Sequence, residues 1–128
     1  MEPRRVLNPE TKLYRALTSG KCINGDSVTD KAFRLRPKND RFPAETSLSV
    51  ALSPDKAMND LDCKGYTELT FGDIERIEGL RVQPKEGEDV ELYEISGIPS
   101  DDFGAQTDYA LALARIAGKA AKVKMPRR

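Results

Sequence analysis

The most constraining feature of this chain is a change of hydrophobic period near its middle. Leu48, Val50 and Leu52 recur at every second position, and this pattern stops at Ser53 and Pro54. Period-two alternation indicates a half-buried strand. Serine followed by proline indicates a helix start, because serine accepts a hydrogen bond from an unpaired amide and proline lacks the donor that would stay unpaired there. A strand is therefore expected to give way to a helix within two residues.

The same rapid change of element continues as far as Gln83. Each predicted element is short, and so is each connection, which favours one shared core. After the first strand we expect a helix that starts at Pro54 and stops at Gly65, a strand at 66–70, a second helix capped by Thr70 and ended by Gly79, and a strand at 80–82.

The flanking segments complete the predicted fold. We predict a single α+β domain over residues 11–126, preceded by a flexible lead-in at residues 1–10. A mixed or mainly antiparallel sheet of five to six strands packs against one long C-terminal helix and two short helices. The further strands are expected at 12–17, 31–36, 90–95 and 121–125, and the long helix at 106–117.

Composition excludes several classes of function. The chain has no histidine, which removes Ser-His and Cys-His nucleophiles, histidine bases and imidazole metal sites. Its two cysteines, Cys22 and Cys63, lack metal-ligand spacing and are expected to be buried or half-buried free thiols. The start, MEPRRVLNPE, has no apolar segment after its basic residues, and no later run could span a bilayer. We therefore expect a cytoplasmic protein with no membrane contact, no metal and no cofactor.

Charge is balanced overall but unevenly distributed along the chain. Residues 1–54 hold ten basic and six acidic side chains, residues 55–108 five and fifteen, and residues 109–128 six and none. This pattern favours a self-complementary surface, or alternatively a basic nucleic-acid patch formed by both ends. Only Phe42 of the basic loop at 37–45 could stack on a base. A protein partner is therefore expected before nucleic acid, and the oligomeric state stays open.

Three local patterns resemble those of small bacterial proteins. The resemblance covers most of the chain and implies no particular activity. The patterns are LYR, AF and LSV at 13–15, 32–33 and 48–50, GDIERIEGLRVQP at 72–84, and ISGIP at 95–99 before an alanine-leucine helix.

A more distant resemblance is to ADP-ribosyltransferase-like domains, including the RES-type toxins that consume NAD. Those folds have an arginine on the first strand, a Ser-x-Ser strand and a later glutamate. Their order is matched here by Arg15, by Ser47 and Ser49, and by Glu91 or Glu94. The resemblance implies that the arginine holds the pyrophosphate, a hydroxyl orients the ribose and the glutamate stabilises positive charge at the anomeric carbon. It would also imply a link with toxin–antitoxin or defence systems.

Two functions are thus expected. The first is a non-enzymatic binding or accessory module that acts through a protein partner. The alternative is an NAD-handling enzyme, which requires Arg15, a serine of 47–49 and a glutamate to open onto one cleft. As a purely structural residue, Arg15 would instead pair with a carboxylate of Glu68, Glu91 or Glu94 across the sheet.

Overall fold

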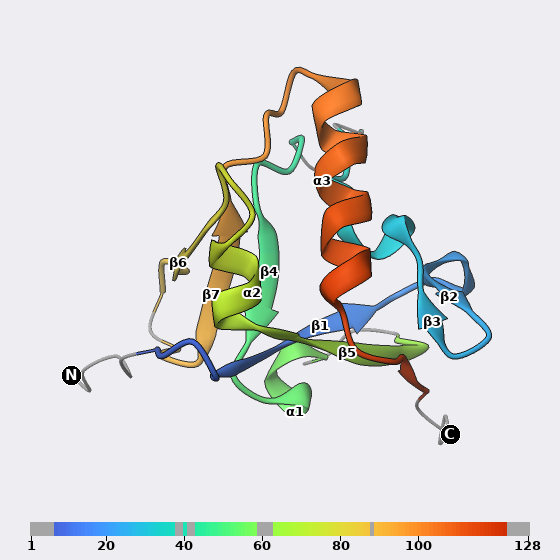
Figure 1. Ribbon diagram of the computed structural model, residues 1–128, viewed down its shortest axis with the longest axis vertical. Coiled ribbons are helices and arrows are strands. Elements are labelled where there is room, and N and C mark those ends of the chain that lie inside the picture. The colour runs from blue at the N-terminus through green and yellow to red at the C-terminus, as the bar shows by residue number, and fades with distance from the viewer. Residues whose placement is uncertain (1–6, 38–39, 41–42, 59–62, 88, 123–128) are drawn as a thin grey trace.

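The computed structural model describes residues 7–37, 40, 43–58, 63–87 and 89–122. It confirms the predicted α+β class, with one long helix near the C-terminal end and several short helices (Figure 1). In chain order the elements are β1 (Lys12–Leu17), the 3-10 helix η1 (Gly20–Cys22), β2 (Ile23–Asn24), β3 (Ser27–Val28), the 3-10 helix η2 (Asp30–Phe33), β4 (Leu48–Ala51), α1 (Pro54–Ala57), β5 (Gly65–Thr70), α2 (Phe71–Glu75), β6 (Arg81–Pro84), β7 (Leu92–Ser96), α3 (Phe103–Ile116) and β8 (Ala121–Lys122).

The main sheet has six strands in the order β6-β7-β4-β1-β5-β8, and every neighbouring pair is antiparallel. β1 pairs with β5 along its whole length, from Lys12 opposite Thr70 to Leu17 opposite Gly65. The strand predicted at 12–17 is confirmed at both ends. A separate two-stranded hairpin, β2-β3, lies between β1 and η2 in the chain.

The sheet is almost divided between β1 and β4. Among the described residues these strands share a single register pair, Tyr14 opposite Ala51. Beyond it they separate, and in Figure 1 β4 and β7 run at a steep angle to β1 and β5. Backbone groups of β4 that would otherwise bond to β1 therefore need other partners. This opening between the two halves of the sheet positions the site described below.

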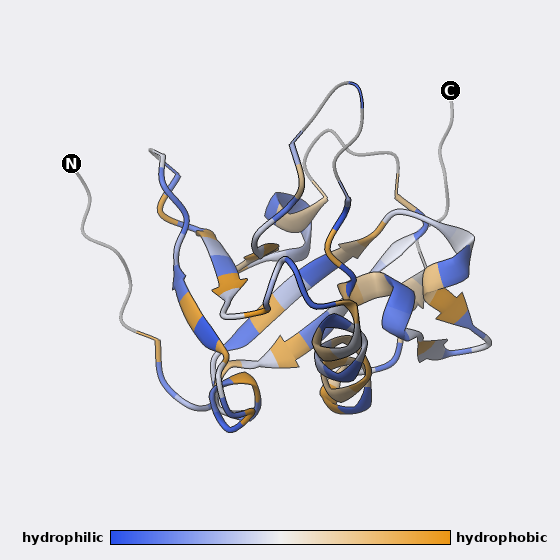
Figure 2. Cartoon of the chain, turned by 90° about the horizontal axis from the view of Figure 1, so that it is seen from above, coloured by the Kyte–Doolittle hydropathy of each residue, from blue (hydrophilic) through white to orange (hydrophobic). Residues whose placement is uncertain are grey.

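One face of the sheet holds the hydrophobic core. The strands carry alternating hydrophobic and hydrophilic bands (Figure 2), as a sheet with one covered face requires. α3 and η2 pack against each other, whereas α1 lies on the opposite side of β1 from α3 (Figure 1). The largest fully buried side chains are Phe33, Leu13, Leu17, Leu48, Leu69, Ile74, Ile95, Leu113, Val50 and Thr67.

The long helix begins three residues before the predicted position because Asp102 caps it. The Asp102 carboxylate accepts a hydrogen bond from the Ala105 amide at 3.0 Å, and the Asp102 carbonyl accepts one from the Gln106 amide at 2.9 Å. The negative charge of Asp102 at this end also interacts favourably with the positive pole of the helix dipole. The first turn is thereby stabilised without apolar contacts.

Replacing Asp102 with alanine should lower the free energy of unfolding by about 1 kcal/mol, the usual contribution of such a cap. Urea denaturation measures this change. Asp102→Asn, which keeps the acceptor, should recover most of it. Asp101→Ala is the matched control, because that exposed neighbour does not cap the helix. Equal losses for the alanine variants at 101 and 102 would contradict the capping role.

Three details of the predicted elements are wrong. The second short helix, α2, ends at Glu75 instead of reaching Gly79, and Thr70 stands at its N-cap position without a side-chain hydrogen bond. Residues 31–36 do not form a strand: η2 ends at Phe33, and the chain continues extended from Arg34. Thr29 caps η2 by accepting from the Lys31 amide at 3.3 Å. Phe33 and Leu35 are nevertheless buried as expected. Gly65 does not stop the first helix, which ends at Ala57, but begins β5.

The ends of the chain are described only in part. Of the predicted lead-in, Leu7 packs against the core, and the Pro9 carbonyl accepts from the Gly72 amide at 3.0 Å. Residues 1–6 and 123–128 lie outside the described residues, so the structure describes only part of the proposed basic patch and only the start of the strand at 121–125. Phe42 also lies outside the described residues. Within the described part, no helix combines the length and apolar character that crossing a bilayer requires.

Candidate functional site

A cavity of about 400 Å³ opens where β1 and β4 separate. It draws side chains from both halves of the sheet, from the loop after β1, from η2 and from α1. Four of its lining residues are basic, and Glu45 is the one acid among the described residues that line it. We call this cavity the Arg15 cleft, and its lining residues are Arg15, Ala16, Thr18, Cys22, Lys31, Ala32, Arg34, Arg36, Glu45, Ser49 and Ala57.

The Arg15 guanidinium bridges the separated strands. It donates from Nε to the carbonyl of Ala32 at 2.8 Å and from Nη1 to the carbonyl of Ser49 at 2.9 Å. The second bond satisfies a β4 carbonyl beside the separated strand β1. A guanidinium has five N–H groups. The other three have no acceptor among the described residues, so Arg15 retains donors for a ligand.

The surroundings of Arg15 make it a poorly solvated cation. Burial lowers the pKa of its guanidinium, whereas the nearby Glu45 carboxylate and Cys22 act in the opposite direction. Guanidinium groups nevertheless stay protonated in proteins. The expected carboxylate pairing of Arg15 with Glu68, Glu91 or Glu94 is wrong, because its hydrogen bonds go to backbone carbonyls. An incoming anion would supply the negative charge that these carbonyls lack.

Three further basic side chains line the cleft, and two of them are held by acids. Arg34 pairs with Asp30 through Nη2 at 2.9 Å. Arg36 pairs with Glu45 through Nη1 at 3.5 Å. Lys31, the third, is exposed and has no ion pair with any described residue. Arg15 and Lys31 are therefore the two cations with capacity for a negatively charged ligand.

Glu45 serves as a structural acid in this cleft. Its carboxylate accepts from the Arg36 amide at 2.6 Å, and its own amide donates to the Arg36 carbonyl at 2.8 Å. Together with the ion pair, these bonds join the segment at 34–36 to the segment that leads into β4. The wall of the cleft is thus fixed by local pairing.

The sequence-predicted residues are only partly brought together. Ser49 lines the cleft, but through its carbonyl bond to Arg15, because its hydroxyl accepts from Lys85 Nζ at 2.7 Å. Ser47 donates from Oγ to Glu94 Oε1 at 2.9 Å. Glu94 also accepts from Gln83 at 2.8 Å. Ser47 and Glu94 therefore form a polar cluster on the sheet that does not line the cleft.

Glu91 is the residue immediately before β7. Its amide donates to Asp89 Oδ1 at 2.9 Å, and its carbonyl accepts from the Leu52 amide at 3.0 Å. It too is absent from the cleft lining. Across the described residues, no group of three histidine, cysteine or acidic side chains has the arrangement of a metal site. Cys22 and Cys63 are buried and are not joined by a disulfide, as predicted.

Sequence reasoning did not select Lys31, Arg36 or Glu45 as site residues. The available signal was the spacing of Lys31, Arg34 and Arg36, whose basic side chains recur within six residues. The chain folds so that this run lines the same cavity as Arg15, and the resulting cluster can hold an anion of phosphate or carboxylate type. Comparison of the chain with protein-family models, with curated proteins and with solved structures found no match.

Proposed function

We propose that this protein binds a phosphate-bearing small ligand in the Arg15 cleft. The observation that supports the proposal most strongly is the state of the Arg15 side chain. It is half-buried and anchored at two N–H groups, and its remaining donors face no acceptor among the described residues. A fixed guanidinium is well suited to phosphate because its planar fork donates two parallel hydrogen bonds.

Lys31, a residue of η2 that also lines the cleft, supports the same proposal. An ammonium group acts as a mobile point charge and complements the directional guanidinium. The charges of Arg34 and Arg36 are compensated by Asp30 and Glu45, so the net positive charge of the cleft comes from Arg15 and Lys31. The site thus combines one fixed fork and one flexible charge around a cavity of about 400 Å³, which is within the range of small-ligand sites.

The two functions expected from sequence relate differently to this proposal. A non-enzymatic binding module fits it directly, although a protein partner stays a prediction. NAD handling shares the phosphate-binding arginine. Its catalytic half stays a prediction, since neither Glu91 nor Glu94 lines the cleft, and Glu45, the acid that does, is held by Arg36.

Inorganic pyrophosphate tests the proposal by isothermal titration calorimetry. We expect saturable binding that weakens with salt, because charge interactions are screened. Arg15→Gln should weaken the affinity at least about tenfold, since a hydrogen bond to a charged group contributes roughly 1.5–3 kcal/mol. Lys31→Gln should weaken it several-fold while leaving the fold intact.

Arg76→Gln is the matched control, because Arg76 is an exposed arginine on the turn after α2 that pairs with Asp73. Its affinity for pyrophosphate should equal that of the unchanged protein. Thermal melts of all variants separate lost binding from lost folding. If pyrophosphate does not bind, or binds equally to the Arg15, Lys31 and Arg76 variants, the proposal is wrong.

A further inference from the structure

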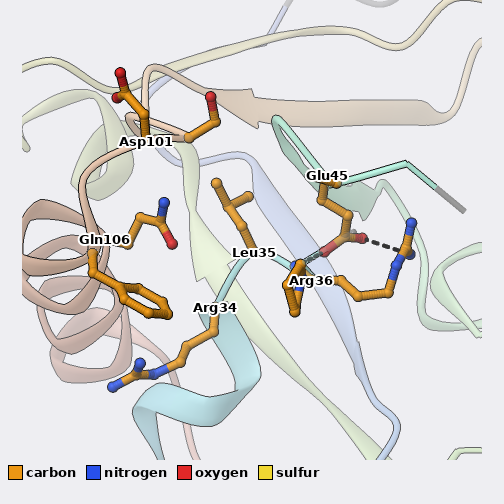
Figure 3. Close-up of a pocket in the computed structure, with 10 residues that line it drawn as sticks. Arg34, Leu35, Arg36, Glu45, Asp101 and Gln106 are labelled. Atoms are coloured by element: carbon orange, nitrogen blue, oxygen red, sulfur yellow. Dashed lines mark hydrogen bonds and ion pairs between the residues drawn. The ribbon is translucent and has the colours of Figure 1, made fainter. Parts of the chain in front are cut away.

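A second hollow adjoins the Arg15 cleft near the start of α3. Its volume is about 650 Å³, and its lining is mainly apolar. Figure 3 shows Leu35 pointing into it, with Gln106 of α3 on one side and Glu45 on the other. We call it the Phe103 hollow, and its lining residues are Arg34, Leu35, Arg36, Pro37, Ala44, Glu45, Ser100, Asp101, Phe103 and Gln106.

Phe103 is the most unusual side chain of this hollow. It is the first residue of α3 and 77% exposed, more than any other large hydrophobic residue among those described. A phenyl ring open to water retains apolar area that a partner could cover. Because this ring lines a concave, mainly apolar cavity, it offers a flat face for a planar aromatic group of a ligand.

The two cavities share part of their lining. Arg34, Arg36 and Glu45 line both, so the two cavities lie next to each other along the segment at 34–36. The pairs Arg34 with Asp30 and Arg36 with Glu45 hold this segment in place. One molecule of moderate length could therefore direct its anionic end to Arg15 and its apolar end to Phe103.

We infer that the ligand of the Arg15 cleft is an aromatic phosphate ester of the nucleotide kind. Its phosphate lies against Arg15 and Lys31, and its ring packs on Phe103 and Leu35. The inference rests on the proposed function and narrows it to ligands that carry both groups. The mainly apolar second hollow favours a neutral ring over a further phosphate or sugar, because a polar group there would lose hydrogen bonds to water.

Two ligands that differ only in the base test this inference. Ribose 5-phosphate and AMP are these two ligands, since they share the sugar phosphate and only AMP carries a base. UMP, with a smaller base, is a third ligand for comparison. In calorimetric titrations, AMP or UMP should bind at least about fivefold more tightly than ribose 5-phosphate, as base–aromatic stacking predicts. Phe103→Ser should abolish this difference and leave the affinity for ribose 5-phosphate within about twofold. Arg15→Gln should weaken the binding of all three.

Leu111→Ser is the matched control, since Leu111 is the other exposed large hydrophobic residue of α3 among those described and does not line the hollow. It should leave every affinity unchanged. Equal affinities for ribose 5-phosphate and both nucleotides would overturn the inference and leave phosphate binding intact. A base-dependent gain that persists in Phe103→Ser would also overturn it. Absence of binding by all three ligands and by pyrophosphate would overturn the proposed function as well.

Discussion

Gly97→Ala should lower the free energy of unfolding by about 3–5 kcal/mol. Gly97 follows β7 with a φ of +105°, a conformation that side chains disfavour. A Cβ atom there would overlap the carbonyl oxygen of Gly79 and lie 3.3 Å from the Cα of Leu80. The obstacle is backbone rather than a flexible side chain, so the turn before β6 would have to move.

That turn is also held by α3, which is why the effect should be large. The Tyr109 hydroxyl donates to the carbonyl of Glu78 at 2.9 Å. Displacing the turn would therefore strain both the sheet and its contact with the helix. The melting temperature should fall by roughly 10–20 °C.

Gly25→Ala is the matched control for Gly97→Ala. Gly25 has a φ of +64°, but a Cβ there meets nothing within 4 Å. Gly25→Ala should lower the free energy of unfolding by about 1 kcal/mol, the contribution of backbone conformation alone. Urea denaturation of both variants gives the comparison. Losses that agree within about 1 kcal/mol would refute the close approach of Gly97 to the turn.

Leu113→Ala should have the second largest effect and lower the free energy of unfolding by about 2.5–5 kcal/mol. Leu113 is completely buried, and Ala110 on the same helix face is too. Truncating a buried leucine removes apolar contacts and leaves a cavity that the neighbours fill only in part. This residue holds α3 to the core, so its truncation tests whether helix and sheet form one folded unit.

Leu111→Ala is the control two residues away on the same helix. Leu111 is 39% exposed, and alanine favours a helix slightly more than leucine. The free energy of unfolding should change by less than about 1 kcal/mol. Chemical denaturation should stay a single transition in both variants. A separate early transition in Leu113→Ala, with the sheet still folded, would contradict a shared core.

The elements that sequence predicted well have strong local signals. β1 matches the prediction at both ends because Leu13 and Leu17 lie four positions apart on one face of the strand, and both are buried. α1 begins at Pro54 as expected, since Ser53 caps it by accepting from the Lys56 amide at 3.2 Å. From β4 to β6 the order of strands and helices also follows the prediction.

The errors occurred where local pattern is ambiguous. The spacing of Phe33 and Leu35 fits either a strand or a turn of 3-10 helix followed by extended chain. The cap from Thr29 and the ion pair between Asp30 and Arg34 select the second form. The hairpin at 23–28 has no counterpart among the predicted elements, because two-residue strands leave no measurable period.

The candidate site could be predicted only in part for a different reason. Arg15 stood out because a cation between two apolar strand positions requires compensation. The hydrogen-bond partners of Arg15 could not be predicted, because they are the backbone carbonyls of Ala32 and Ser49 and no side-chain pattern encodes them. The separation of β1 from β4 depends on tertiary packing, so the cleft itself had no sequence signal.

The most direct test of the Arg15 cleft is a titration with inorganic pyrophosphate followed by two-dimensional ¹H–¹⁵N NMR. The Arg15 Nε–Hε signal and the backbone amides of Lys31 and Ser49 should shift together and saturate at one dissociation constant. The amide of Arg76, on the turn after α2, should not follow them. No shift at Arg15, or shifts confined to residues outside the cleft, would contradict phosphate binding at this site.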